Sequence, residues 1–215
     1  MRLTIVYDNE VFMQGIGLQS DWGFACQINT SKDTILFDTG TNGDILLNNM
    51  EKLHLNPYEI RKIVISHEHN DHNGGLPVLS PFLTTCDIYR LKPNPLNGVL
   101  RNICVEKPQQ ICENIWTTGR LKGPIDEQAL MLKGRNGCYV LTGCSHPGVE
   151  TILHEAQQVG DIVGIIGGFH GFHSLSALEK LKCICPCHCT KYKREIRKRY
   201  PQTYTACGVG QHIEL

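Results

Sequence analysis

The chain has 215 residues, of which 41% are hydrophobic and 20% are charged, and its formal net charge is zero. This length and composition are typical of a globular protein with one substantial core, and we predict a single domain over residues 1–215. The balanced charge and the absence of any apolar run near the roughly 20 residues of a membrane span give no sign of a membrane or nucleic-acid partner.

The first third of the chain is rich in strand-like runs. Apolar, β-branched segments between turn-forming residues predict strands at Leu3–Tyr7, Gly23–Ile28 and Thr34–Phe37. Apolar spacings of three and four residues predict a helix over Asn42–Leu53. A short helix at Pro57–Arg61 is predicted to lead into a strand at Ile63–Ile65.

The rest of the chain continues this alternation of strands and helices. Residues 81–125 contain five prolines between short apolar runs, including Pro93 and Pro95, which predicts short strands and loops. We then predict a hairpin of Gln128–Leu132 with Cys138–Leu141. The strands predicted after it are Ile162–Ile166 and Lys182–Pro186. The helices predicted after it are Val149–Ala156, Ser174–Leu181 and Lys191–Arg199.

The strand at Ile63–Ile65 ends in a dense group of potential metal ligands with the spacing H-x-H-x-D-H. Residues two apart in an extended segment point the same way, so His67 and His69 can hold one cation. After a turn, Asp71 and His72 can face a second cation beside the first. Imidazole nitrogen and carboxylate oxygen suit zinc and iron, so this segment predicts a metal site.

Acids or histidines follow other predicted strands in the same way. Asp38 ends the third strand, and His146, His170 and His188 each follow a later one. Loops at strand ends, held by a packed sheet, are where open sheet folds usually place ligand chemistry. We therefore expect these loops to form one functional site.

These residues, in this order, resemble the metallo-β-lactamase superfamily. Its signature is an aspartate after an early strand, H-x-H-x-D-H, a later histidine, a bridging aspartate and a final histidine. The resemblance implies an α/β fold, a four-layer αββα sandwich with two mixed sheets flanked by helices. It also implies a dinuclear site for two divalent metal ions, with zinc as the first expectation and iron or manganese as alternatives.

The resemblance assigns a ligand to each position of the signature. One metal would be held by His67, His69 and His146, and the other by Asp71, His72 and His188. Asp71 is also expected to take part in catalysis. Asp38 is expected to hydrogen-bond the ligand loop and to orient its rings instead of binding metal.

The chain departs from the signature at the bridging aspartate. The strand that should deliver it ends in Gly167-Gly168-Phe169-His170. Asp161 begins that strand and lies roughly 23 Å from Gly168 at about 3.3 Å per residue, so it cannot substitute. We predict that His170 takes this place, either as a metal ligand or as a catalytic proton donor.

Three motifs resemble a subgroup of the superfamily related to pterin-pathway phosphate synthases (dihydropterin aminobenzene phosphate synthase-like). They are Gly143-Cys144-Ser145-His146, Gly167-Gly168-Phe169-His170 and His188-Cys189-Thr190. The last motif is followed by Lys191 where the subgroup usually has glycine. Because Lys191 opens a basic helix directly after His188, we predict that it contacts a substrate phosphate.

Eleven cysteines without a recognisable signal peptide favour reduced thiols in a cytoplasmic protein. The alternating cysteines Cys183, Cys185, Cys187 and Cys189 are consistent with a second zinc site, a redox switch or small buried residues, and the last interpretation fits better. Four ligands about 6.6 Å apart along one strand cannot surround one ion without sharp bending.

The functional prediction is a metal-dependent hydrolase that uses a metal-bound hydroxide on an ester, a phosphoester, a lactone or a cyclic amide. We expect a small-molecule substrate, with phosphorylated compounds among the candidates, and we do not expect nucleic acid or membrane. Assembly into a homo-oligomer is left open. Two alternatives stay open as well: a diiron redox or oxygen-handling protein on the same scaffold, and a non-catalytic metal-binding protein.

Overall fold

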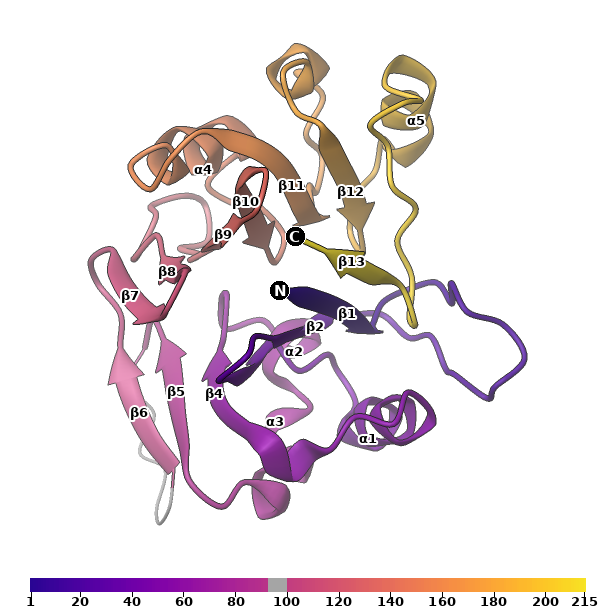
Figure 1. Ribbon diagram of the computed structural model, residues 1–215, viewed down its shortest axis with the longest axis vertical. Coiled ribbons are helices and arrows are strands. Elements are labelled where there is room, and N and C mark those ends of the chain that lie inside the picture. Colours follow the sequence, from indigo (N-terminus) through magenta and orange to yellow (C-terminus); the bar gives the residue numbers. More distant parts are fainter. Residues whose placement is uncertain (93–99) are drawn as a thin grey trace. The chain divides into compact units, whose positions relative to one another are not determined.

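The computed structural model describes residues 1–92 and 100–215, and Figure 1 labels most of its helices and strands. The predicted loop prolines Pro93 and Pro95 lie outside the described residues. The chain separates into two compact units. Unit 1 comprises residues 1–106 and 207–214, and unit 2 comprises residues 107–206 and residue 215. That they form one domain, as the sequence predicts, stays a prediction.

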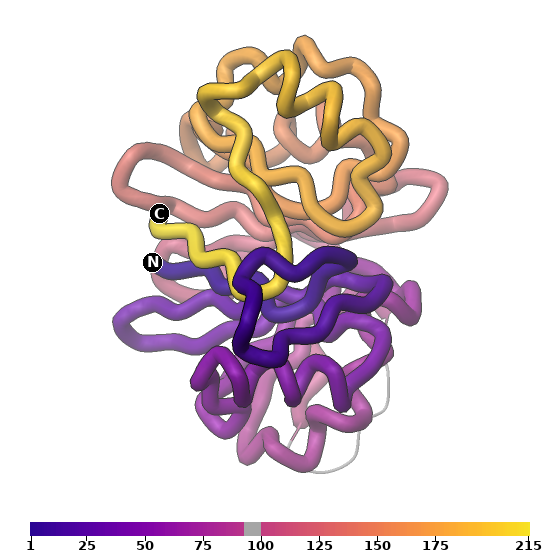
Figure 2. Tube along the Cα trace, turned by 90° about the vertical axis from the view of Figure 1, so that its right-hand side faces the viewer, coloured from indigo at the N-terminus to yellow at the C-terminus, as the bar shows by residue number. Residues whose placement is uncertain are grey.

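Unit 1 contains a seven-stranded mixed sheet of order β13-β1-β2-β3-β4-β5-β6. The strands β13, β1, β2 and β3 are antiparallel, and β3, β4, β5 and β6 run parallel. Figure 2 shows the indigo amino-terminal strand beside the yellow carboxyl-terminal one. The bounds are β1 Arg2–Tyr7, β2 Ala25–Asn29, β3 Thr34–Phe37, β4 Ile60–Val64, β5 Cys86–Arg90, β6 Leu100–Cys104 and β13 His212–Glu214.

Helices cover one face of this sheet. Leu46 and Met50 of α1 pack with Leu79 of α3 against buried strand residues such as Leu36 and Ile63. Asn42 caps α1, because its side chain accepts hydrogen bonds from the amides of the first turn. The bounds are α1 Gly43–Lys52, the 3₁₀ turn η1 Pro57–Glu59, α2 Asn70–Asn73, α3 Leu76–Leu79 and the 3₁₀ turn η2 Ser80–Phe82.

Unit 2 contains a six-stranded mixed sheet of order β12-β11-β10-β9-β8-β7. Here β12, β11 and β10 are parallel, and β10, β9, β8 and β7 are antiparallel. The bounds are β7 Gln109–Cys112, β8 Ile115–Thr117, β9 Leu130–Gly134, β10 Gly137–Thr142, β11 Ile162–Gly168 and β12 Cys183–Cys187.

Helices also pack on one face of this second sheet. Ile152 of α4 and Ile196 of α5 share a buried cluster with Val140, Ile165 and Ile184 of the strands. The bounds are α4 Val149–Ala156, the 3₁₀ turn η3 Leu175–Leu178 and α5 Lys193–Arg199. The predicted fold class, α/β with two mixed sheets flanked by helices, is confirmed. In the part of the chain that the structure describes, no helix is long and apolar enough to cross a membrane.

Several element predictions need correction. The helix predicted at Pro57–Arg61 is only the turn η1, because β4 begins at Ile60 and pairs with β3. The helix predicted at Ser174–Leu181 is the short 3₁₀ turn η3. Cys189 does not continue the alternation of the cysteine-rich segment, since β12 ends at Cys187 and His188 turns the backbone with a φ of 43°.

Candidate metal centre

The predicted site residues follow the parallel strands of the two sheets at their carboxyl ends. In unit 1, Asp38 follows β3 and His67 follows β4 closely. In unit 2, the corresponding residues after β10, β11 and β12 are His146, His170 and His188. Parallel strands align their carboxyl ends at one sheet edge, which gathers these residues within each unit.

The backbone at these strand ends adopts an unusual conformation. Six non-glycine residues have positive φ in the described chain, and four of them follow these strands: Asp38, Ser145, His170 and His188. The left-handed region costs such residues about 1–2 kcal/mol each. Backbone strain of this kind clusters at functional sites, where the surrounding structure holds it in place.

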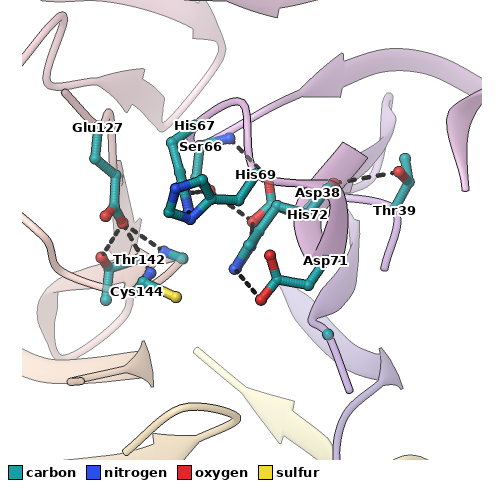
Figure 3. Close-up of polar contacts among 12 residues, drawn as sticks. Asp38, Thr39, Ser66, His67, His69, Asp71, His72, Glu127, Thr142 and Cys144 are labelled. Carbon is teal, nitrogen blue, oxygen red and sulfur yellow. Dashed lines mark hydrogen bonds and ion pairs between the residues drawn. The ribbon is translucent and has the colours of Figure 1, made fainter. Parts of the chain in front are cut away.

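The histidines of H-x-H-x-D-H form one compact group in unit 1, shown in Figure 3. His67 Nε2 lies 3.1 Å from His69 Nδ1. Two nitrogens bound to one tetrahedral zinc at 2.0–2.1 Å lie about 3.3 Å apart, so this spacing fits a shared ion. His69 has an extended backbone and is the N-cap residue of α2.

A second donor pair follows directly in the same segment. Asp71 Oδ2 lies 3.8 Å from His72 Nε2, and the His67 and His72 rings are 4.2 Å apart between centroids. The indole Nε1 of Trp22 donates to Asp71 Oδ2 over 2.9 Å. The two donor pairs are therefore adjacent, as the sequence predicted for two neighbouring cations.

Asp38 has the supporting position that the resemblance implied. Its buried carboxylate accepts from His72 Nδ1 at 2.7 Å, from the Ser66 amide at 2.7 Å and from Ser66 Oγ at 2.8 Å. Burial raises the pKa of the Asp38 carboxyl, and the contacts with His72 and Ser66 act against that rise. The bond to Nδ1 turns Nε2 of His72 away from Asp38, toward Asp71.

Two further supports in unit 1 were not predicted from the sequence. Ser66 Oγ lies 2.9 Å from His67 Nδ1 and so fixes the ring that offers Nε2 to the pair. Glu68, which separates the first two histidines, binds the buried Arg90 guanidinium with both carboxylate oxygens and accepts from Asn73 at 3.1 Å. The spacer residue thus ties the ligand loop to the end of β5.

The Glu68–Arg90 pair gives a testable prediction. We expect Glu68→Gln to lower the free energy of unfolding by about 1–3 kcal/mol, because Arg90 keeps its buried charge without a carboxylate partner. Urea denaturation of the two proteins measures the difference. A Glu59→Gln variant, at an exposed turn, is the matched control and should unfold with the parent midpoint. Equal midpoints for all three proteins would contradict this role of Glu68.

In unit 2, the loops after β11 and β12 are held together. Thr190 Oγ1 accepts from the Phe169 amide at 2.9 Å and donates to Cys187 O at 2.7 Å. The Lys191 amide donates to His170 O at 2.9 Å. Thr190 therefore has a structural role that the sequence did not reveal, and Lys191 lies beside His170 in the fold.

His170 and His146 lie side by side, with ring centroids 5.2 Å apart. His170 is exposed, whereas His188 is almost fully buried. The Lys191 side chain is exposed, and its Nζ lies 5.3 Å from the centre of the Tyr192 ring. The predicted residues of unit 2 thus lie on the three loops that follow β10, β11 and β12.

Packing explains why β11 carries no acid at its end. A Cβ on Gly168 would lie 2.4 Å from Gly143 O and 2.7 Å from Cys189 Sγ, so no side chain fits there. Phe169 is buried in the core. His170 is consequently the first residue after β11 whose side chain lies outside the core.

Among the site residues that were not predicted, Glu127 makes the most extensive hydrogen bonds. Its fully buried carboxylate accepts from Thr142 Oγ1 and from the amides of the loop that carries His146. The amide contacts are Gly143 at 3.0 Å, Cys144 at 3.0 Å, Ser145 at 3.1 Å and His146 at 2.9 Å. Figure 3 shows part of this arrangement. Glu127 precedes β9 in a segment without a recognisable motif.

Comparison with known proteins identifies the class. The family model described as "Metallo-beta-lactamase superfamily" matches residues 17–89, which include the first two strand-end loops. Tm1679, described as a metal-dependent hydrolase of the β-lactamase superfamily, superposes with a TM-score of 0.80 at 25% identity, covering 100% of this chain and 99% of that one. In sequence and in fold the chain therefore resembles the metallo-β-lactamase superfamily.

Two further proteins are similar to this chain, one in sequence and one in fold alone. A Methanocaldococcus jannaschii protein named 7,8-dihydropterin-6-methyl-4-(β-D-ribofuranosyl)-aminobenzene-5'-phosphate synthase is 27% identical, over 87% of this chain and 86% of its own. The predicted resemblance to that subgroup is thereby confirmed. The metallo-β-lactamase fold protein YhfI of Bacillus subtilis shares the fold, with a TM-score of 0.71 at 11% identity over 99% of this chain and 98% of its own.

Proposed function

We propose that the chain is a metal-dependent hydrolase with a dinuclear centre, acting on a phosphorylated small molecule. One cation would be held by His67, His69 and His146. The other would be held by Asp71, His72 and His188, with His170 at the edge of the centre. This assignment follows the order of ligands in the superfamily signature.

One observation carries the proposal: the two adjacent donor pairs in the H-x-H-x-D-H segment. The His67–His69 nitrogens are 3.1 Å apart, and the Asp71 oxygen and His72 nitrogen are 3.8 Å apart. Nitrogen and oxygen donors of this kind suit zinc, iron and manganese, with zinc favoured by the histidine content. Each pair leaves coordination positions for further ligands and for substrate.

Two divalent cations bound here would acidify a water molecule and neutralise negative charge on a phosphoryl or carbonyl oxygen. The chain's own residues would prepare the centre for this. Asp38 and Ser66 orient the His72 and His67 rings, and Trp22 holds Asp71 through its indole nitrogen. His170, exposed beside His146, is suited to exchange a proton with the leaving group.

The substrate proposal rests on charge and on the relative's name. Lys191 is an exposed cation whose backbone is bonded to that of His170, which suits contact with a phosphate. The Methanocaldococcus jannaschii relative is named for a product that carries a 5'-phosphate. Its name also describes a synthase, so a second candidate is a synthase that joins two substrates, one of them phosphorylated.

We expect Lys191→Met to raise the KM for a phosphorylated substrate about tenfold or more, because a charge-assisted hydrogen bond contributes about 1.5–3 kcal/mol. The kcat should change little if the contact is the same in the ground and transition states. Steady-state kinetics on the phosphorylated compound and on its dephosphorylated form separate the two parameters. A KM that rises equally for both compounds would contradict a phosphate contact.

Hydrolysis of bis(p-nitrophenyl) phosphate tests the proposed reaction. The zinc- or manganese-loaded protein should release p-nitrophenol, and chelator treatment should abolish the release until metal is restored. In H₂¹⁸O the phosphate product should gain ¹⁸O, as hydrolysis requires. No turnover of this or other esters, with product formed only from paired substrates, would favour the synthase.

A further inference from the structure

We propose that Glu127 is the positioning residue for His146, and that its carboxylate acts as an internal anion around which the loop of residues 143–146 folds. The inference rests on the proposed function, because it takes His146 to be a metal ligand. Glu127 itself is not proposed to contact substrate or metal. It acts on the centre through the backbone of residues 143–146.

The hydrogen-bond pattern shows how this works. Four consecutive amides, from Gly143 to His146, point at one carboxylate, three of them at Oε1 and the last at Oε2. Successive amides that converge in this way form an anion-binding concavity. Such concavities usually hold a ligand such as phosphate, whereas here the protein supplies the anion from its own chain.

The convergence also accounts for the shape of the loop. Ser145 has a φ of 60°, which is unfavourable for a residue with a side chain. Hydrogen bonds that amides donate to a carboxylate are charge-assisted and about twice as strong as neutral ones, so Glu127 can stabilise this turn. Since His146 follows Ser145 directly and donates its own amide to Oε2, the position of its ring depends on the turn.

The same loop is tied to the strand that leads to His170. Ser145 Oγ donates to Gly168 O at 2.7 Å and lies 3.1 Å from Thr142 Oγ1, which itself donates to Glu127. The Gly168 amide donates to Gly143 O at 2.9 Å. The Glu127 carboxylate thus lies at the middle of a network that fixes the loops of both histidines.

An isosteric substitution isolates this role. Glu127→Gln keeps the size of the side chain but removes its charge, and its amide group would place a donor against one of the loop amides. We expect it to weaken the affinity for one zinc ion per chain about 10–100-fold, the effect typical of losing a residue that supports a ligand. Zinc affinity is measured by chelator competition on the full chain.

Two further readouts separate positioning from a general structural effect. Hydrogen exchange of the metal-free protein should become faster in residues 143–146 in Glu127→Gln, with little change in the strands. In a His146→Ala background, Glu127→Gln should weaken zinc binding no further, because the ligand it positions is gone. Asp126→Asn is the matched control: Asp126 neighbours Glu127 but pairs with Arg120 and Lys122 outside the loop.

The outcomes distinguish the inference from the function it rests on. Zinc affinity that falls in His146→Ala but stays at the parent value in Glu127→Gln would overturn the inference alone. Zinc affinity unchanged in His146→Ala would overturn the proposed ligand set and the inference with it. If Glu127→Gln does not fold, Glu127→Asp replaces it, since the shorter side chain keeps the charge but cannot reach all four amides, and the same loss of zinc is expected.

Discussion

His67→Ala should reduce zinc affinity and phosphodiesterase turnover by more than about 100-fold each. About 100-fold is the upper end of the effect of losing a residue that only supports a metal ligand. His67 contributes a nitrogen to the first donor pair, and its ring lies 4.2 Å from that of His72 in the second. One substitution is therefore expected to disturb both of the proposed cations. Zinc affinity by chelator competition and kcat/KM for bis(p-nitrophenyl) phosphate measure the two effects.

His154→Ala is the matched control for this prediction. His154 is an exposed histidine within α4, where alanine is favourable. The control variant should bind zinc and turn over substrate like the parent. Full activity in His67→Ala would show that the H-x-H-x-D-H segment does not form the catalytic centre.

Asp38→Ala is expected to have the largest effect on stability, about 3–5 kcal/mol in the free energy of unfolding. In the variant, His72 Nδ1, the Ser66 amide and the Ser66 hydroxyl stay buried without the carboxylate that they contact in the parent. It should also weaken zinc binding, because His72 loses the bond that orients its ring. Urea denaturation and zinc titration measure the two losses separately.

Asp87→Ala provides the comparison for Asp38. Asp87 pairs with Arg101, whose side chain is 72% exposed, and such pairs contribute about 0–1 kcal/mol. Its loss should leave zinc binding unchanged. If Asp38→Ala destabilised the protein no more than Asp87→Ala, the buried carboxylate would not be the support that its contacts indicate.

The strand-end residues of this site could be predicted because they lie close together in the sequence, in short recognisable motifs. His67, His69, Asp71 and His72 lie within six residues after an apolar run, and the structure gathers them as that spacing requires. The roles of these residues as ligands follow from the superfamily and stay predictions. Most strands were also predicted within a few residues, because buried apolar runs have a strong periodic signal.

Glu127 and the Glu68–Arg90 pair could not be predicted as supports, because their partners are distant in the sequence. Glu127 bonds amides 16–19 residues away, and Arg90 bonds Glu68 across 22 residues. Neither lies in a pattern that a local spacing rule recognises. The helix predicted at Pro57–Arg61 was wrong for a different reason. Pairing of β4 with β3 takes Ile60 into the sheet and ends η1 after one turn.

In the proposed centre the H-x-H-x-D-H segment would hold two cations, one at each donor pair. Metal content per chain is measured on the parent, His69→Ala and His170→Ala after loading with zinc and desalting. We expect about two zinc ions in the parent and about one in His69→Ala. About one ion in His170→Ala would make His170 a metal ligand, and about two would give it the proton-transfer role. About one ion or fewer in the parent, or about two in His69→Ala, would contradict a two-cation centre at this segment.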